Sequence, residues 1–256
     1  MPDPIIRVRG VRKAFGDNEV LKGVDLDVET GSITVVIGPS GCGKSVLIKH
    51  LIGLLRPDAG SILVEGEDIT ILSEAALTVT RRTFGMLFQQ SALFDSMTVL
   101  ENVTFPLVEH SRLPRRRIRD LAVERLNQLG LFGVEGKYPA ELSGGMRKRV
   151  GLARATILDP KIVIYDEPMT GLDPIMSENV EEMILTAQRQ LRVTSIVISH
   201  DMASTFRIAN KVAMLFDGRI VVDGSPEAVK SSRNDVVRKF IYLSGTGPLT
   251  LPEAAG

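Results

Sequence analysis

The sequence "ITVVIGPSGCGKSVLIKHLIGLL", residues 33–55, decides the fold of this 256-residue chain. Its opening residues are rich in Val and Ile and do not alternate with polar residues, which is typical of a strand buried on both faces of a parallel sheet. A glycine-rich turn follows, and after it comes an apolar helical pattern. This order of strand, turn and helix indicates an α/β protein whose ligands bind at the carboxyl ends of its strands.

The glycine-rich turn, "GPSGCGKS", fits the phosphate-binding motif G-x-x-x-x-G-K-[ST]. Its glycines allow backbone N–H groups to point inward around a β-phosphate, and the following helix adds its positive end. Lys44 would bring a charge to the β- and γ-phosphates, and Ser45 an oxygen for Mg²⁺. A chance glycine-rich turn is the alternative, but motif, strand and helix coincide here. The predicted nucleotide-binding residues of this loop are Gly38, Pro39, Ser40, Gly41, Cys42, Gly43, Lys44, Ser45 and Val46.

Composition restricts the class of protein. Lys plus Arg and Asp plus Glu number 31 each, so the net charge of zero gives no basic field that would indicate nucleic-acid binding. The single cysteine, Cys42, excludes an intramolecular disulfide framework and fits a reducing compartment. No apolar run approaches the roughly 18 residues of a membrane-spanning helix, and the start "MPDPIIRVRG" has no signal-peptide core. We therefore expect a cytosolic protein, or one held at a membrane only through a partner.

Two further buried strands are predicted, "KIVIYDE" at 161–167 and "TSIVISH" at 194–200, and a helical pattern follows each. Pro174 suits the first turn of the helix after the former. The first thirty residues contain alternating stretches with Gly and Asp turns, which predict a small antiparallel sheet laid against the core. From about 98 to 157 the pattern is mostly helical, and we interpret this segment as an inserted helical subdomain.

The end of the chain is predicted to contain a short helix from Pro226 and a second one around "DVVRKFIYL". The last residues, 245–256, are rich in Gly and Pro and should form no regular element. We therefore predict one domain over residues 1–244, followed by a tail. Leu249 and Leu251 suggest that the tail docks on a partner subunit, and plain disorder is the alternative.

Acidic and basic groups at the ends of the other two buried strands complete the predicted phosphate site. Asp166 ends one strand and is suited to hold the Mg²⁺ shell, through water, while Glu167 could polarise an attacking water as general base. An acidic pair at a strand end is otherwise commonly a helix N-cap. His200 ends the other strand, where it could reach a γ-phosphate or be held in a structural hydrogen bond.

A second anion-binding helix start is predicted in "LSGGMRKRVGLARA", residues 142–155. Ser143 is a good N-cap, and the N–H groups of Gly144, Gly145 and Met146 then have no helical partner. Because the two glycines have no side chain, an anion can approach this helix end closely. Met146 shares one helix face with Val150, Ala153 and Ile157 and is expected to pack. The nearby basic residues, most of them expected to be solvated or paired, are Arg147, Lys148, Arg149 and Arg154.

The stretch "LSGGMRKRVGLARA" resembles the signature motif of ATP-binding cassette (ABC) ATPases, and the other family motifs occur in the expected order over about residues 5–230. Phe15 in "KAFG" matches the aromatic residue that stacks on adenine. Gln89 in "MLFQQ" matches the glutamine that touches Mg²⁺ and senses the permease, with the adjacent Gln90 as the alternative. "YDEPMTGLD" matches the Walker B motif and D-loop, ending at Asp173, and "ISHD" matches the switch histidine, His200.

This resemblance implies an ABC ATPase, that is, a P-loop α/β core with an antiparallel β subdomain and a helical subdomain. It implies ATP and Mg²⁺ as ligands, with Glu167, His200, Lys44 and Gln89 in catalytic roles and with Ser45, Gln89 and Asp166 facing the metal. It further implies a head-to-tail homodimer, in which ATP lies between the phosphate loop of one subunit and the signature residues, 143–145, of the other. Membrane permease subunits would dock in a groove between the core and the helical subdomain.

A narrower resemblance concerns the cargo. The segments "SVLIKHLIGLLRPDAGSILVEGEDI", "FQQSALFDSMTVLENVTFPL" and "VTSIVISHDM", together with Met146 after the signature glycines, are similar to the branch that serves Mce-domain lipid transporters, including the Mla phospholipid system. That branch implies a lipid-transport ATPase at the cytoplasmic face of the inner membrane, with an Mce-domain protein and a small STAS-domain subunit as partners. The alternatives are an ABC ATPase for another solute and, more remotely, a non-transport ABC protein.

Overall fold

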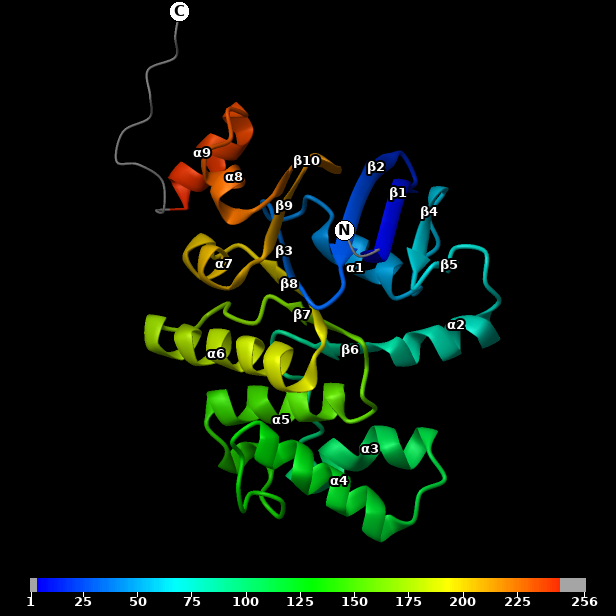
Figure 1. Cartoon of the computed structure of the whole chain (residues 1–256), viewed down its shortest axis with the longest axis vertical. Coiled ribbons are helices and arrows are strands. Elements are labelled where there is room, and N and C mark those ends of the chain that lie inside the picture. Colours follow the sequence, from blue (N-terminus) through cyan, green and yellow to red (C-terminus); the bar gives the residue numbers. More distant parts are fainter. Residues whose placement is uncertain (1–3, 245–256) are drawn as a thin grey trace, which may run out of the picture. The chain divides into compact units, whose positions relative to one another are not determined.

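The computed structural model describes residues 4–244, which divide into two compact units (Figure 1). The first unit contains residues 4–29, 33–70 and 198–244 of the described chain, and the second contains residues 30–32 and 71–197. Each unit is described by itself.

An antiparallel sheet forms the beginning of the first unit. Its strands, in order across the sheet, are β2 (Asn18–Glu29), β1 (Pro4–Phe15), β4 (Ala59–Val64) and β5 (Glu67–Asp68). The β1–β2 hairpin is paired from Pro4 opposite Glu29 to Phe15 opposite Asn18. Side chains such as Ile6, Val8 and Leu26 are buried while many of their neighbours are exposed, as expected of a sheet with one face on the core. The antiparallel sheet predicted for the first thirty residues is therefore confirmed.

The first unit also contains the strand that leads into the phosphate loop. β3 (Ile33–Ile37) is buried throughout and runs parallel to β9 (Lys211–Phe216), which in turn pairs antiparallel with β10 (Arg219–Gly224). The helices of this unit are α1 (Lys44–Leu51), α7 (Met202–Ile208), α8 (Pro226–Lys230) and α9 (Asp235–Leu243). The strand, the glycine loop and the helix predicted for residues 33–55 all form, and so do the two helices predicted after Gly224.

Strands with continuous apolar runs form the sheet of the second unit. Its strands are β6 (Phe84–Leu87), β7 (Ile162–Asp166) and β8 (Thr194–Ser199), whose final residues fall in the first unit. β6 and β7 are parallel, with Phe84 opposite Ile162 and Leu87 opposite Tyr165. β8 is buried along its whole length, and Ile162–Tyr165 of β7 are buried as well, which confirms both buried strands predicted from the sequence.

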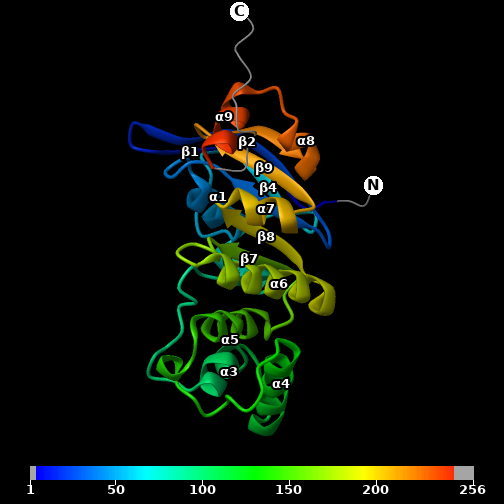
Figure 2. The same ribbon diagram turned by 90° about the vertical axis from the view of Figure 1, so that its left-hand side faces the viewer.

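Helices make up the rest of the second unit. They are α2 (Glu74–Thr80), the short 3-10 helix η1 (Arg81–Thr83), α3 (Val99–His110), α4 (Arg115–Gln128), the 3-10 helix η2 (Pro139–Glu141), α5 (Gly144–Thr156) and α6 (Pro174–Leu191). Pro174 occupies the first position of α6, as predicted. Helix α5 packs against α3, α4 and α6, and the two ribbon views agree on this grouping (Figure 2). A separate helical subdomain over 98–157 stays a prediction, and the predicted tail, 245–256, lies outside the described residues.

Helix α5 also packs closely on β6. Two glycines, Gly85 of β6 and Gly151 of α5, allow this approach because they have no side chain. A Cβ atom at Gly85 of β6 would lie 2.2 Å from the carbonyl oxygen of Ala155 of α5. One at Gly151 would lie 2.8 Å from Cδ1 of Leu87 and 3.1 Å from Cβ of Ser91. Since real Cβ atoms do not approach other atoms this closely, both positions need glycine so that the helix can reach the sheet.

We predict that Gly85→Ala lowers the free energy of unfolding by at least ~1–3 kcal/mol, because the new methyl group meets a backbone oxygen that no rotamer change can move. Urea unfolding of the purified chain, followed by circular dichroism, measures the change. Gly136→Ala is the matched control, since a Cβ there meets nothing within 4 Å. Equal stability of the two variants would contradict the close packing of α5 on β6.

Candidate functional site

The phosphate loop of the first unit connects β3 to α1. The ammonium of Lys44 is buried and donates to the carbonyl oxygens of Gly38 (2.8 Å) and Pro39 (3.0 Å). Gly43, with φ 107°, is the N-cap of α1 and provides no side-chain cap, and the first turn of α1 contains no acidic residue. Helix α1 therefore begins where the sequence predicts it, and anion binding by its first amide groups stays a prediction.

Steric limits explain why this loop is rich in glycine. A Cβ atom on Gly38 would lie 2.1 Å from the carbonyl oxygen of Leu215 and 2.9 Å from the sulfur of Cys42. Gly43 is similarly enclosed, with Cδ2 of Leu21 at 3.0 Å from such an atom. Cys42 is half-buried, and burial raises the pKa of its thiol. The loop is thus closely packed at Gly38 and Gly43, whereas Ser45 is exposed.

Two other predicted residues belong to the first unit. Phe15 ends β1 with 47% of its surface exposed, and Nζ of Lys13 lies 5.7 Å from its ring centroid. An exposed ring of this kind can stack on a planar base. His200 follows β8 and is exposed, immediately before Asp201, whose carboxylate accepts the N–H of Ser204 and caps α7.

The predicted acidic pair lies at the carboxyl end of β7, in the second unit. Asp166 is the last residue of the strand, and Glu167 begins the turn with a left-handed φ of 48°. The hydroxyl of Thr170 donates to a carboxylate oxygen of Glu167 at 2.9 Å, and the N–H of Thr170 donates to the Glu167 carbonyl at 3.2 Å. One carboxylate oxygen of Glu167 is therefore held by a residue of its own loop.

Gln89 and Asp173 also lie in loops of the second unit. Gln89 follows β6 with its side chain exposed, and so does the alternative residue, Gln90. Asp173 is the N-cap of α6, where its carboxylate accepts the N–H of Met176 at 2.8 Å. This capping bond gives Asp173 a local structural role, which the sequence analysis did not assign.

Helix α5 begins as predicted. Ser143 is its N-cap, and the hydroxyl of Ser143 accepts the N–H of Met146 at 3.3 Å. The Met146 amide, one of the three predicted to have no helical partner, is therefore bonded to the cap, and the amides of Gly144 and Gly145 stay the predicted anion-binding groups. A Cβ atom on Gly144 or Gly145 would meet only ordinary contacts, at 3.4 Å or more. Packing within this chain thus does not require glycine there, which fits a surface that another group approaches.

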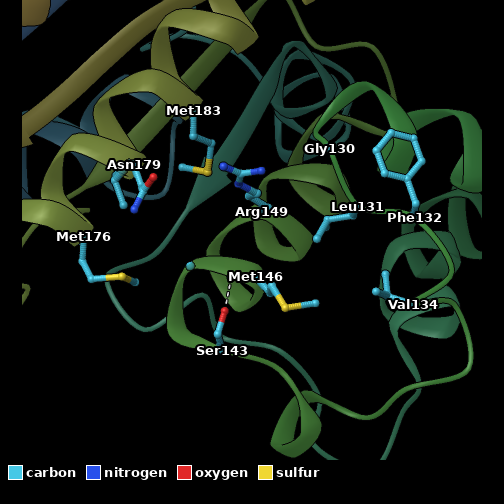
Figure 3. Close-up of a pocket in the computed structure, with 12 residues that line it drawn as sticks. Gly130, Leu131, Phe132, Val134, Ser143, Met146, Arg149, Met176, Asn179 and Met183 are labelled. Atoms are coloured by element: carbon cyan, nitrogen blue, oxygen red, sulfur yellow. Dashed lines mark hydrogen bonds between the residues drawn. The ribbon is translucent and has the colours of Figure 1, made fainter.

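A hollow of about 400 Å³ lies beside this helix start (Figure 3). Its lining includes Met146 of α5 together with Met176 and Met183 of α6, and Arg149 lies between them and the loop at Leu131. Val150, Ala153 and Ile157 are buried, as predicted, whereas Met146 is only half-buried and faces this hollow. Methionine suits such a position because its side chain adapts to irregular space.

The predicted site residues fall into two groups. The loop residues 38–46, Phe15 and His200 belong to the first unit, and Gln89, Asp166, Glu167, Asp173 and residues 143–145 belong to the second. Their meeting around one nucleotide stays a prediction. Among residues 4–244, no group of three or more His, Cys, Asp or Glu side chains could hold a metal ion, so Mg²⁺ would need phosphate and water oxygens as well. None of the helices in the described chain is long and apolar enough to span a bilayer.

Two basic residues of α5 differ from the expectation that they are solvated or ion-paired. Lys148 and Arg154 are largely buried, and each donates to backbone carbonyl groups, Lys148 to those of Gln89 and Pro168, and Arg154 to that of Ser91. Their periodicity in the sequence does not distinguish them from the exposed Arg147, so the sequence contains no signal for this arrangement.

Comparison with known proteins agrees with this geometry. The model of the family described as "ABC transporter" matches residues 21–170. The chain is 43% identical to the "Probable ribonucleotide transport ATP-binding protein mkl" of Mycobacterium leprae, over 97% of this chain and 72% of that protein. It is 38% identical to the "Intermembrane phospholipid transport system ATP-binding protein MlaF" of Haemophilus influenzae, over 97% of this chain and 94% of that protein.

Solved structures give the same result. The chain matches cbiO1 of Clostridium perfringens, part of the ABC transporter complex cbiONQ, with a TM-score of 0.84 and 30% identity, over 94% of this chain and 95% of that one. A dimeric, post-hydrolysis ATP-binding cassette bound to ADP and Pi, MJ0796, matches with a TM-score of 0.76 and 29% identity, over 86% of this chain and 98% of that one. Family model, sequence relatives and fold agree, and the chain belongs to the ABC transporter family as an ATP-binding subunit, with relatives in the Mla/Mce-type branch that the sequence predicted.

Proposed function

We propose that this chain hydrolyses ATP to drive an ABC transporter that moves phospholipid or another lipid at the bacterial inner membrane. The observation that carries the hydrolytic part is the geometry of Glu167, whose carboxylate is held at the end of β7 by Thr170. The lipid part is supported by the likeness to the phospholipid-transport protein MlaF, which extends over 94% of that relative.

Binding of the nucleotide follows from the first unit. The amides at the start of α1 and the ammonium of Lys44 would hold the β- and γ-phosphates. For this, Lys44 exchanges its bonds to the Gly38 and Pro39 carbonyls for bonds to phosphate oxygens. The exposed ring of Phe15 would stack on adenine.

Hydrolysis requires the second unit. Glu167 would accept a proton from the attacking water, because its carboxylate is held by Thr170 directly after the end of β7. Ser45, Gln89 and, through water, Asp166 would hold Mg²⁺, which when bound neutralises charge on the phosphates. His200, exposed at the end of β8, would donate to the γ-phosphate.

A second copy of the chain would complete the site. Residues 143–145 present the Gly144 and Gly145 amides at a helix start that packing leaves open, which suits the γ-phosphate of a nucleotide bound by another subunit. Dimeric ABC cassettes among the matched structures support this arrangement. The proposed homodimer would therefore bury two ATP molecules between its subunits.

A groove of about 540 Å³ in the second unit is our candidate for the permease-docking surface. Its apolar lining includes Phe94 and Phe105, whose ring centroids are 5.1 Å apart. Its basic lining residues are Arg81, Arg82, His110 and Arg154, and no acidic residue of the described chain, 4–244, lines it. Apolar and acidic side chains on a membrane partner would therefore complement this surface. An Mce-domain protein and a STAS-domain subunit are proposed as further partners on the likeness to the Mla/Mce branch alone.

Another solute remains the second candidate for the cargo, since the mycobacterial relative is named for ribonucleotide transport. Cargo is selected by other subunits, so the ATPase chemistry is the same in both cases. Identification of the molecule that copurifies with the complex in a gentle detergent distinguishes the two candidates. A bound lipid supports lipid transport, and another bound solute supports the alternative.

Loss of the general base is the direct test of hydrolysis. We expect Glu167→Gln to lower ATP turnover by at least ~100-fold, because the amide cannot accept the proton, while ATP binding is unchanged. Steady-state phosphate release and equilibrium binding of a fluorescent ATP analogue give the two values. Glu182→Gln removes an exposed carboxylate of α6 that pairs with Arg189 and serves as the control. Retained hydrolysis in Glu167→Gln would show that Glu167 is not the base.

The phosphate loop can be tested through Cys42. Alkylation of this thiol should abolish nucleotide binding, because an adduct has no space beside Gly38, and bound ATP should protect Cys42 from the reagent. Labelling followed by mass spectrometry, and ATP binding of the labelled protein, provide the measurement. Cys42→Ala should bind ATP both before and after exposure to the reagent. Full ATP affinity after stoichiometric labelling is the contrary outcome.

The arginines of the docking groove predict that attachment of membrane subunits depends on positive charge there. We expect Arg82→Glu to abolish copurification of membrane subunits with the tagged chain, because it places a carboxylate where the acidic partner binds, while ATP turnover of the isolated chain is unchanged. Arg119→Glu on the exposed face of α4 makes the same charge change outside the groove. If both variants retain the membrane subunits, permease docking lies elsewhere.

A further inference from the structure

Helix α5 bears a buried ammonium that no step of the proposed mechanism uses. Only 7% of Lys148 is exposed, and Nζ donates to the carbonyl oxygen of Gln89 at 3.3 Å and to that of Pro168. Burial lowers the pKa of Lys148. Both carbonyl groups belong to loops that carry predicted catalytic residues, Gln89 itself and Glu167, the neighbour of Pro168.

The two loops contain left-handed backbone at residues other than glycine. In the loop after β6, φ is 61° at Ser91 and 43° at Ala92, and in the loop after β7 it is 48° at Glu167. Such conformations are unfavourable for residues other than glycine and persist only where the surrounding structure holds them. The bonds from Lys148 are therefore placed where the backbone needs external support.

A second contact from α5 supports the same loop. Nη2 of Arg154 donates to the carbonyl oxygen of Ser91 at 2.9 Å, and burial lowers the pKa of Arg154 too. The helix comes this close because Gly151 has no side chain toward Ser91. The loop that carries Gln89 is thus held at two of its carbonyl groups by one helix.

Packing alone does not explain a lysine at this position. Removing an ammonium from water is costly, and the two neutral carbonyl groups offset less of that cost than a carboxylate would. A side chain such as Met would fill a similar volume without the cost. What Lys148 adds over an apolar residue is a pair of directed bonds that join two separate loops.

We propose that Lys148 is a positioning residue, which ties the signature helix α5 to the loops of Gln89 and Glu167 so that both move with the start of that helix. This inference rests on the proposed function, because it uses the assigned roles of Gln89 and Glu167. When a nucleotide on another subunit shifts Ser143–Gly145, α5 would shift as well. The bond from Lys148 to the Pro168 carbonyl would then move the loop that carries Glu167. Binding of ATP by the phosphate loop, which belongs to the other unit, does not depend on it.

The test compares Lys148→Met, Lys148→Arg and Lys211→Met in the full-length chain. Met keeps much of the volume of the lysine side chain and removes its donors, whereas Arg keeps charge and donors. Lys211 is the matched control, since it is a half-buried lysine of the first unit that donates to the Asp27 carbonyl at 3.1 Å and pairs with Asp223. Steady-state hydrolysis, binding of a fluorescent ATP analogue, melting temperature and amide hydrogen exchange are measured for each variant.

We expect Lys148→Met to lower kcat by at least ~10-fold with little change in KM or in ATP binding, and Lys148→Arg to restore most of the loss. Amide exchange at residues 89–92, 167, 169 and 170 should accelerate at least ~10-fold in Lys148→Met and remain unchanged in Lys211→Met. Lys211→Met should lower the melting temperature without altering kcat.

Unchanged kcat and unchanged exchange in these loops, with a melting temperature lowered as in Lys211→Met, would overturn the proposal and leave Lys148 a structural residue. Should Lys148→Met not fold, Lys148→Gln, which keeps an N–H donor on a shorter chain, replaces it in the same measurements. If the unaltered chain does not hydrolyse ATP, the proposed function is wrong. The rate of amide hydrogen exchange in the two loops would still show whether Lys148 holds them in place.

Discussion

The close approach of helix α5 to strand β6 is the contact on which the second unit depends. Gly85 and Gly151 remove the side chains that would separate the helix from the strand and from the loop that follows it. Because the helix lies this close, Lys148 and Arg154 can donate to the carbonyl oxygens of Gln89 and Ser91. At a larger distance between helix and loop, these oxygens would bond to water instead. One pair of glycines thus fixes the position of the signature helix and, with it, the backbone around Gln89 and Glu167.

Each of the two units contains a helix whose first turn is predicted to offer main-chain amides to an anion. Helix α1 begins at Gly43 and helix α5 at Ser143 followed by two glycines, so each presents main-chain amides at its positive end. The two starts differ in what requires glycine. In the phosphate loop, neighbouring atoms exclude any Cβ at Gly38, whereas at Gly144 and Gly145 the chain itself leaves space. The phosphate loop is thus closely packed, whereas the start of α5 leaves the space that the proposed approach of a nucleotide on another subunit requires.

Much of the fold could be predicted from the sequence because its signals are local. Continuous Val and Ile runs identified β3, β7 and β8, and Pro174 and Ser143 marked helix starts that the structure confirms. The role of Lys148 could not be predicted in this way, whereas Asp173, directly before Pro174, is a local capping signal of the same kind as Ser143. Neither the residue type nor the position along the helix distinguishes a buried lysine from a solvated one. The hydrogen-bond partners of Lys148 are backbone carbonyl groups, which every residue has, so they leave no mark in the sequence. Such contacts depend on how elements pack, which no short motif encodes.

The burial of Lys148 has a consequence for how the protein responds to its solution. Mobile ions screen charges at an exposed surface over roughly 8 Å at physiological ionic strength, but they do not enter a packed interior. The hydrogen bonds of the buried Lys148 are therefore screened by dissolved salt far less than charges in the arginine-lined groove. A rising salt concentration would therefore weaken the proposed attachment of an acidic partner and leave the bonds proposed for Lys148 intact.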